Sequence, residues 1–287
     1  MILVTGCNPL GQRLAEKLPL AKGACDRSNP EIPRGFLEYD ALDARSIERL
    51  LGDEKPETVL LAEEIDSIEY CEQHRVDAME YNTRSVRFFC EAAVRRGIRV
   101  VYRSSAYVFD GRKPGGLYTE TDRTNPLDVY GETKLMGEVH ADKAPEFLIV
   151  RVGELYGSYS GNFASHIYNS LRCGEKAELA RDMYFSPVLL EDAAHAIGAL
   201  TTRRMTGWYN IAGPERISHY EFGRRIAGAF GLDEGLLVPL SMAELGLTVP
   251  VPQDTSLDSA KLSALLPVQG IAEGLAAVKR DLQSRRN

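Results

Sequence analysis

MILVTGCNPLG, residues 1–11, is the stretch that decides the expected fold, because an apolar run rich in β-forming residues leads directly into a glycine turn. A helical pattern follows as far as Leu18, which gives the order strand, turn, helix. Such a turn points the amides of a helix N-terminus at an anion, and the pyrophosphate of a dinucleotide fits there. Gly6 and Gly11 are only five residues apart, however, so the turn is one residue short of the usual pattern. The two glycines could instead form no more than a tight connection between a strand and a helix.

The residues in and after this turn are the first candidates for cofactor binding. Pro9 lacks an amide hydrogen, but proline is well tolerated at the first position of a helix. A further strand is expected near residues 24–25 and ends at Asp26, 20 residues past Gly6, where an acidic side chain would meet the ribose of an adenosine. Asp26 would favour NAD, whereas Arg27 could accept the additional phosphate of NADP, and the sequence leaves this choice open. From the turn itself, the expected contacts are Gly6, Asn8, Leu10 and Gly11.

Strand-like and helix-like segments alternate through the first half of the chain. The strand-like runs are 2–4, 35–39, 58–61, 99–102 and 147–151, and helical patterns occur at 44–51, 76–96 and 130–141. This alternation predicts an α/β fold with a Rossmann-like, doubly wound parallel sheet. After Gly157 the alternation loosens, which predicts a smaller C-terminal substrate-binding lobe. The expected dinucleotide-binding domain is 1–156 with a returning segment at about 187–212, and the expected lobe is 157–186 with 213–287.

Tyr130 and Lys134 form a second informative pattern, since residues four apart on a helix share one face. A phenol titrates near pH ~10, which is too high for efficient acid and base catalysis at neutrality, and a neighbouring lysine cation favours the phenolate. The pair therefore suits proton transfer to or from a sugar or alcohol oxygen. The alternative is a surface tyrosine stacked on a lysine stem, which is the commoner origin of this spacing.

Composition restricts the class of partner. A net charge of −7, from 34 basic and 41 acidic side chains, argues against binding to nucleic acid or to an anionic membrane surface. No apolar run approaches the ~20 residues that span a bilayer. Five scattered cysteines, with no signal peptide expected, predict reduced thiols in a cytoplasmic protein. Cys71 and His74 have the spacing of half a metal site, but no second half matches, so no metal is predicted.

Several motifs, in their order along the chain, resemble those of the extended short-chain dehydrogenase/reductases, the NAD-dependent epimerase/dehydratase superfamily. They are Thr5-Gly6 at the first turn, Asn82 on a long helix, SSAYVFDG at 104–111 and YGETK at 130–134. Within the superfamily the chain is most similar to the dTDP-4-dehydrorhamnose reductases. This similarity lies in residues 107–111, 118–120, 125–127, 130–138, 151, 156–157, 161–163, 186–187, 212–214 and 220–222, and so spans nearly the whole chain.

The resemblance implies a role for each of three central residues. Ser105 would hydrogen-bond the substrate carbonyl, and Tyr130 would give a proton to the carbonyl oxygen. Lys134 would bind the nicotinamide ribose and lower the pKa of Tyr130. Two preplaced donors stabilise the negative charge that builds on the oxygen more strongly in the transition state than in the ketone. The resemblance thus implies a reductase that uses NADP(H) or NAD(H).

Further contacts are implied by the same resemblance. For the cofactor they are Asp40, Ala62 and Asn82, and for the substrate they are Ala106, Tyr107, Arg151 and Asn162. Asn82 could instead brace the backbone, and Arg151 could equally be a structural ion-pair partner. The implied partner is a small molecule, a nucleotide sugar, and the family is compatible with a homodimer whose interface the sequence does not reveal.

Departures from the family pattern cluster around the expected pocket. Ala106 stands where the family commonly has an aspartate, and Glu63 and Glu64 stand where small alanines let the cofactor lie close. Two carboxylates there could repel a dinucleotide unless they turn outward or bind ribose hydroxyls. Ile65-Asp66 and Val152-Gly153-Glu154 also differ from the family signature. These changes favour an altered substrate over rhamnose synthesis.

Three hypotheses remain open from the sequence. The first is a reductase of a keto-sugar nucleotide or related carbonyl compound that uses NADPH or NADH. The second is a nucleotide-sugar epimerase or dehydratase that retains its NAD through the whole cycle. The third is a non-catalytic binding or regulatory protein on the same fold, which the short glycine turn and the pair Glu63 and Glu64 motivate. Fold alone does not choose among them.

Overall fold

The computed structural model describes residues 1–285, and the chain forms two compact units. Unit 1 comprises residues 1–108, 124–151 and 194–209. Unit 2 comprises residues 109–123, 152–193 and the chain from 210 on. The roles expected for the two parts of the chain stay predictions at this point.

Unit 1 is built on a twisted α/β sheet of seven strands in the order β11-β6-β5-β4-β1-β2-β3. The strands are β1 (Ile2–Thr5), β2 (Ala21–Asp26), β3 (Leu37–Tyr39), β4 (Thr58–Leu61), β5 (Arg99–Ser105), β6 (Phe147–Val152) and β11 (Gly207–Ile211). β1 pairs in parallel with both β2 and β4, so that Thr5 lies opposite Ala24 on one side and Leu61 on the other. The order of the strands reverses between β1 and β4, and ligands bind at such a switch point, beyond the carboxyl ends of the strands. The Rossmann-like sheet predicted from the sequence is confirmed.

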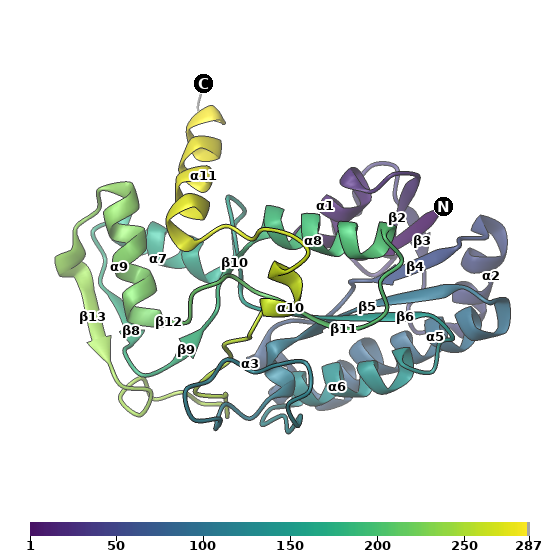
Figure 1. Ribbon diagram of the computed structural model, residues 1–287, viewed down its shortest axis with the longest axis horizontal. Helices are drawn as coiled ribbons and strands as arrows, with labels where there is room; N and C mark the ends of the chain where they lie inside the picture. The colour runs from purple at the N-terminus through teal and green to yellow at the C-terminus, as the bar shows by residue number, and fades with distance from the viewer. Residues whose placement is uncertain (286–287) are drawn as a thin grey trace. The chain divides into compact units, whose positions relative to one another are not determined.

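Helices cover both faces of this sheet (Figure 1). They are α1 (Pro9–Lys17), α2 (Ala44–Glu54), α3 (Ile68–Gln73), α4 (Arg75–Met79), α5 (Ser85–Arg96), α6 (Val129–Ala141) and α8 (Leu190–Thr202), of which α8 enters unit 1 at Ala194. α2, α5 and α6 pack together on one face, and α1 lies with α8 on the other, where Leu18 approaches Gly198. The core between the sheet and the layer of α2, α5 and α6 is apolar and includes Leu3, Ile47, Val59, Phe89 and Ile149.

Two short helical turns that are not α-helical, one π-helical and one 3₁₀, lie near the carboxyl edge of the sheet. The helix expected over 76–96 is interrupted by one π-helical turn, η1 (Glu80–Arg84), which contains Asn82. Such turns occur frequently at functional sites. A 3₁₀ turn, η2 (Ala106–Val108), follows β5 directly. Both deviations from regular helix lie beside the residues that the sequence singled out, and neither has a periodicity signal from which it could have been predicted.

Unit 2 packs helices around short two-stranded sheets. Its strands are β7 (Leu155–Tyr156), β8 (Ala177–Ala180), β9 (Tyr184–Phe185), β10 (Val188–Leu189), β12 (Ile217–Ser218) and β13 (Leu237–Leu240). Its helices are α7 (Phe163–Arg172), α9 (His219–Phe230), η3 (Glu234–Leu236), α10 (Ala260–Ser263) and α11 (Ile271–Ser284). Aromatic and aliphatic side chains fill the core, among them Tyr156, Phe185, Phe222, Ile226 and Leu275. Within residues 1–285, every helix is too short or too polar to cross a membrane.

Candidate functional site

The glycine turn after β1 is tight and holds the start of α1 at the carboxyl edge of the sheet. Gly6 has φ +124°, a backbone conformation that favours glycine, and a Cβ on Gly11 would lie 2.3 Å from the carbonyl oxygen of Gly6. Asn8 caps α1, because its Oδ1 accepts from the Gly11 amide at 2.9 Å while its Nδ2 donates to the Ala62 carbonyl at 2.6 Å. Leu10 is buried in the core. The short turn therefore places the N-terminus of α1 at the carboxyl edge of the sheet, and binding of a pyrophosphate there stays a prediction.

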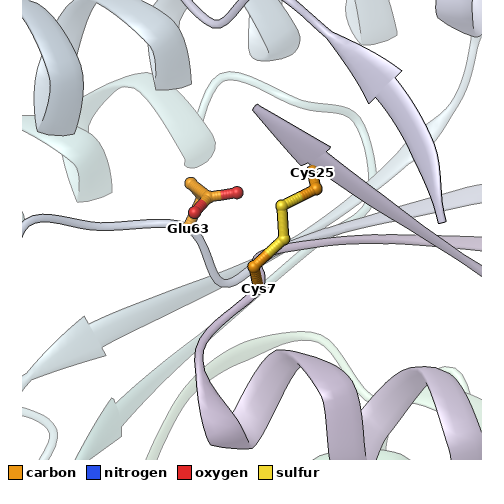
Figure 2. Close-up of side chains that lie close together, drawn as sticks. All are labelled: Cys7, Cys25 and Glu63. Atoms are coloured by element: carbon orange, nitrogen blue, oxygen red, sulfur yellow. A yellow bond between two sulfur atoms is a disulfide. The ribbon is translucent and has the colours of Figure 1, made fainter. Parts of the chain in front are cut away.

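Cys7 and Cys25 meet beside this turn and form a disulfide (Figure 2). Their Cα atoms are 5.6 Å apart, within the usual range for a disulfide. The register of β1 against β2 brings them together, since Thr5 lies opposite Ala24. The prediction of five reduced thiols is therefore wrong for this pair, because separation along the chain says nothing about register. The other cysteines, Cys71, Cys90 and Cys173, are free.

Glu63, directly after β4, faces the disulfide. One of its carboxylate oxygens and the two sulfur atoms all lie within 4.8 Å of one another (Figure 2). Burial raises the pKa of Glu63 to about 7, and the neighbouring charge of Asp26 adds to this effect. Its Oε2 has no hydrogen-bond partner among residues 1–285. A carboxyl group with this pKa can be neutral at physiological pH, which lessens the repulsion expected toward a phosphate.

The residues expected at the adenosine point in opposite directions. Asp26 is buried, and its two carboxylate oxygens accept from the amides of Ser28 at 2.8 Å and Ala41 at 3.1 Å. Arg27 has a side chain that is 66% exposed and forms an ion pair with Asp40. Arg27 and Asp40 both line a pocket of about 440 Å³ beside β3 and α2. Asp26 thus points inward and holds two loops, and the Arg27–Asp40 pair is the more accessible.

Ser105, Tyr130 and Lys134 come together at the carboxyl end of β5. Ser105 is the last residue of that strand, and Tyr130 and Lys134 lie on α6, whose first turn is capped by Asp128. A Cβ on Gly131 would lie only 2.2 Å from the Tyr107 carbonyl oxygen, so the helix packs directly against the turn after β5. Tyr130 is 5% exposed and Lys134 is 2% exposed. The alternative of a surface tyrosine stacked on a lysine stem is therefore wrong.

A buried carboxylate, Glu64, joins this group. Lys134 Nζ donates to Glu64 Oε2 at 2.7 Å, and the Tyr130 hydroxyl donates to the same oxygen at 3.3 Å. Arg103, on β5, forms an ion pair with the other carboxylate oxygen. The Glu64 side chain is 1% exposed, so the departure from the family pattern at this position turns inward. Sequence reasoning missed Arg103, although an arginine directly after the apolar run at 100–102 was the available signal.

The charges of this cluster act on Tyr130 in an unexpected direction. Burial raises the pKa of Tyr130 well above its ordinary value, and the Glu64 carboxylate raises it further. Arg103 and a hydrogen bond with Ser105 oppose this shift without cancelling it. Burial lowers the pKa of Lys134, against the effect of Glu64. The pKa of Tyr130 is thus raised and not lowered as expected, with burial as the largest cause, and Lys134 is paired with Glu64.

Asn82 braces the loop that carries Glu64. Its Oδ1 accepts from the Ile65 amide at 2.7 Å, and its Nδ2 donates to the Ile65 carbonyl at 2.9 Å and to Thr133 Oγ1 at 3.1 Å. These bonds tie the residue after Glu64 to α6. Asn82 therefore has the backbone-bracing role that the sequence left open, and its side chain is fully engaged within the protein.

Arg151, which was expected at the substrate, is engaged in a buried ion pair. Arg151 binds Glu138 through two hydrogen bonds of 2.9 and 2.8 Å, and both side chains are 5% exposed. Glu138 also accepts from Ser104 at 2.6 Å and from Trp208 at 3.3 Å. The geometry thus matches the alternative of a structural ion pair for Arg151. Sequence reasoning missed Glu138, although it lies four residues after Lys134 and therefore on the same face of α6.

Asn162 and the residues after β5 complete the set of expected contacts. Asn162 lies in unit 2 and caps α7, where its Oδ1 accepts from the Ser165 amide at 3.0 Å. Its Nδ2 donates to the Gly157 and Tyr159 carbonyls, so the side chain holds its own loop. Ala106 is buried, and Tyr107 is half-buried and makes an edge contact with the Tyr130 ring. Substrate contacts at these positions stay predictions.

Tyr130 and Lys134 lie on the helix beside β5, at the carboxyl edge of a sheet whose first strand leads into a glycine turn. This is the arrangement of an NAD(P)-dependent extended short-chain dehydrogenase/reductase. The chain belongs, more narrowly, to the RmlD substrate binding domain family, whose sequence profile matches residues 1–283. The superfamily and the likeness to dTDP-4-dehydrorhamnose reductases expected from the motifs are therefore confirmed.

Three known proteins illustrate the similarity. A dTDP-4-dehydrorhamnose reductase from Aggregatibacter actinomycetemcomitans is 26% identical over 93% of this chain and 94% of its own. The methionine adenosyltransferase 2 subunit beta of Xenopus tropicalis is 29% identical over 81% of this chain and 72% of its own. The crystal structure of the dTDP-4-dehydrorhamnose reductase from Bacillus anthracis in complex with NADP shares the fold, with a TM-score of 0.84, 23% identity and 98% of each chain covered.

Proposed function

We propose that this chain is an NAD(P)H-dependent reductase of a keto-sugar nucleotide or related carbonyl compound. The observation that carries the proposal is the convergence of Ser105, Tyr130 and Lys134 at the carboxyl end of β5. The relatives named as dTDP-4-dehydrorhamnose reductases, at 26% identity, support a nucleotide sugar as the class of substrate. The NADP complex of the Bacillus anthracis protein, which shares the fold, supports the class of cofactor.

The residues at the sheet edge fit a dinucleotide. The turn that starts at Gly6 leads into α1, and the positive end of a helix dipole suits a pyrophosphate. Glu63 can be neutral beside it, since its pKa is about 7. Lys134 would hold the nicotinamide ribose, and the exposed Arg27 beside Asp40 would accept the additional phosphate of NADP. The nicotinamide would supply the hydride.

The side chains of this site would handle the proton and the charge. Tyr130 would give its proton to the carbonyl oxygen, and the Ser105 hydroxyl would donate a hydrogen bond to the same oxygen. Both donors act on charge that develops in the transition state, so they lower the barrier and do not merely bind the ketone. The burial of Tyr130 and Lys134 excludes water from these groups and strengthens each interaction.

Cofactor binding tests the proposal directly. Purified protein, checked for copurified nicotinamide, is titrated with NADPH and with NADH while the fluorescence of the dinucleotide is followed. We expect saturable binding of NADPH, with weaker binding after Arg27→Ala, and no such change after Arg204→Ala, which removes an exposed arginine of a different ion pair. No binding of either dinucleotide at millimolar concentration would overturn the reductase.

A second candidate is a binding or regulatory subunit on the same fold. The methionine adenosyltransferase 2 subunit beta, at 29% identity, is named as a subunit of another enzyme, which favours this candidate. Saturable cofactor binding without reduction of any of a panel of keto-sugar nucleotides would support the subunit over the reductase.

A further inference from the structure

We propose that Glu64 is a positioning residue that holds Tyr130 as a neutral phenol and balances the charge of Lys134. This inference rests on the proposed function and concerns the protonation state of its proton donor. The group that gives a proton in a reduction takes one in the reverse oxidation, so Glu64 sets the pH at which Tyr130 loses its proton and does not choose the direction of the reaction.

Geometry supports this role for Glu64. The Tyr130 hydroxyl donates to Glu64 Oε2 at 3.3 Å, and a phenol donates such a bond only while it holds its proton. Lys134 Nζ donates to the same oxygen at 2.7 Å, so its charge is balanced by the carboxylate and is not free to favour a phenolate. Asn82 fixes the adjacent residue Ile65, which holds the carboxylate in place.

The other groups facing Tyr130 do not reverse this balance. Asp66, from the same loop as Glu64, also acts to keep the phenol neutral, while Arg103 from β5 and the Ser105 hydroxyl act in the opposite sense. Cys71, on α3, belongs to the same buried cluster as Tyr130, and burial raises its own pKa to about 11, so this thiol is uncharged near neutrality. Burial itself is the largest influence and favours the neutral phenol.

The test follows the phenolate of Tyr130 by ultraviolet absorbance as pH rises, which needs neither cofactor nor substrate. Wild type and Glu64→Gln are each titrated against the same protein carrying Tyr130→Phe, so that the difference isolates one tyrosine. We expect the phenolate of Tyr130 to appear at a pH lower by about 1–3 units in Glu64→Gln, the effect typical of removing a close charge. Glu63→Gln, the same change in the preceding residue, should leave the Tyr130 titration unchanged.

Other results decide against the inference. A Tyr130 titration that is the same in wild type and Glu64→Gln would overturn it, even if cofactor binding proceeds normally. Failure of wild type to bind any dinucleotide would instead overturn the proposed function, and the titration would still report on Glu64. If Glu64→Gln does not fold, Glu64→Asp keeps the charge but withdraws the carboxylate, and a shift in the same direction is expected. If the chain reduces a carbonyl substrate, the pH above which kcat/KM for reduction declines should be lower in Glu64→Gln than in wild type, in step with the phenolate titration.

We also propose, from a separate observation, that Cys7 and Cys25 are a redox-active pair at the dinucleotide turn. Their disulfide joins the turn after β1 to the end of β2, within a buried setting that includes Glu63 (Figure 2). In a protein expected to be cytoplasmic, a disulfide is typically transient and either catalytic or redox-sensing. The pair would form by exchange with a low-molecular-weight disulfide, in which each protein thiol loses its proton, one sulfur–sulfur bond forms in the protein, and two small thiols are released.

Counting free thiols by alkylation and mass spectrometry tests this pair. The exposed Cys173 can itself form a mixed disulfide with glutathione, so every protein in the test carries Cys173→Ser, which leaves four cysteines in the parent. We expect four alkylated thiols after dithiothreitol and two after glutathione disulfide, with full return on renewed reduction. Adding Cys7→Ser or Cys25→Ser should give three thiols under both conditions. Adding Cys90→Ser is the matched control with a buried cysteine outside the pair, and it should give three and one. Four thiols throughout, or a native disulfide that dithiothreitol does not reduce, would overturn the proposal.

Discussion

Replacement of Tyr130 by phenylalanine is expected to lower kcat for ketone reduction by about 10²–10⁴-fold, the range typical of losing a general acid. Phenylalanine keeps the ring that fills the buried position against Tyr107, so the fold should persist. The proton donor is lost, whereas the turn after β1 and Lys134 are unchanged, so affinity for NADPH should stay within a few fold. Steady-state oxidation of NADPH with a keto-sugar nucleotide gives kcat, and fluorescence titration gives the affinity.

A matched tyrosine separates this effect from the loss of a hydroxyl in general. Tyr70 lies on α3, and its hydroxyl donates to Asp77 at the surface. Tyr70→Phe removes the same atoms and should leave kcat unchanged. If Tyr130→Phe retained a tenth or more of the wild-type kcat, Tyr130 could not be the proton donor, and a water molecule or another acid would have to take its place.

The fold could be predicted because its signals are local. An apolar run at 2–4, a glycine turn and a helical pattern are read from neighbouring residues, and β1 and α1 begin and end close to the expected places. The same holds for Tyr130 and Lys134, whose spacing on one helix is preserved in α6. Asp26 also lies at the end of β2, as the spacing from Gly6 predicted.

The composition of the site was harder to predict because it depends on pairing over long distances in the chain. Glu64 and Lys134 are separated by 70 residues, and Cys7 and Cys25 meet only through the register of two strands. The sequence marked Glu63 and Glu64 as departures from the family pattern, but it could not tell that each carboxylate would turn inward to a different partner. Burial is the largest cause of the raised pKa of Tyr130, and the inward Glu64 carboxylate adds to it, so the pKa moves opposite to the expected direction.

The buried partner of Arg151 was not predicted from the sequence either. Replacement of Arg151 has the second large expected effect, a loss of stability. Arg151→Met is expected to lower the free energy of unfolding by about 3–5 kcal/mol, because it leaves the buried Glu138 without its cation. Urea unfolding at neutral pH, followed by circular dichroism, gives this value. Arg204→Met, which removes the cation of the exposed pair with Glu146, is the control and should change stability by about 0–1 kcal/mol.

The double variant Arg151→Met with Glu138→Met distinguishes a structural ion pair from a substrate contact. Replacing both charges by apolar side chains removes the uncompensated charge, so much of the lost stability should return, and such replacements are often neutral. Ser104 and Trp208 would each lose their hydrogen bond to Glu138, and these two losses account for the stability that the double variant does not recover. If Arg151 instead bound substrate, Arg151→Met would raise KM with little change in stability, and the double variant would restore nothing. A large loss of stability in the single variant that the second substitution largely reverses therefore identifies Arg151 as part of the scaffold that holds β6 against α6.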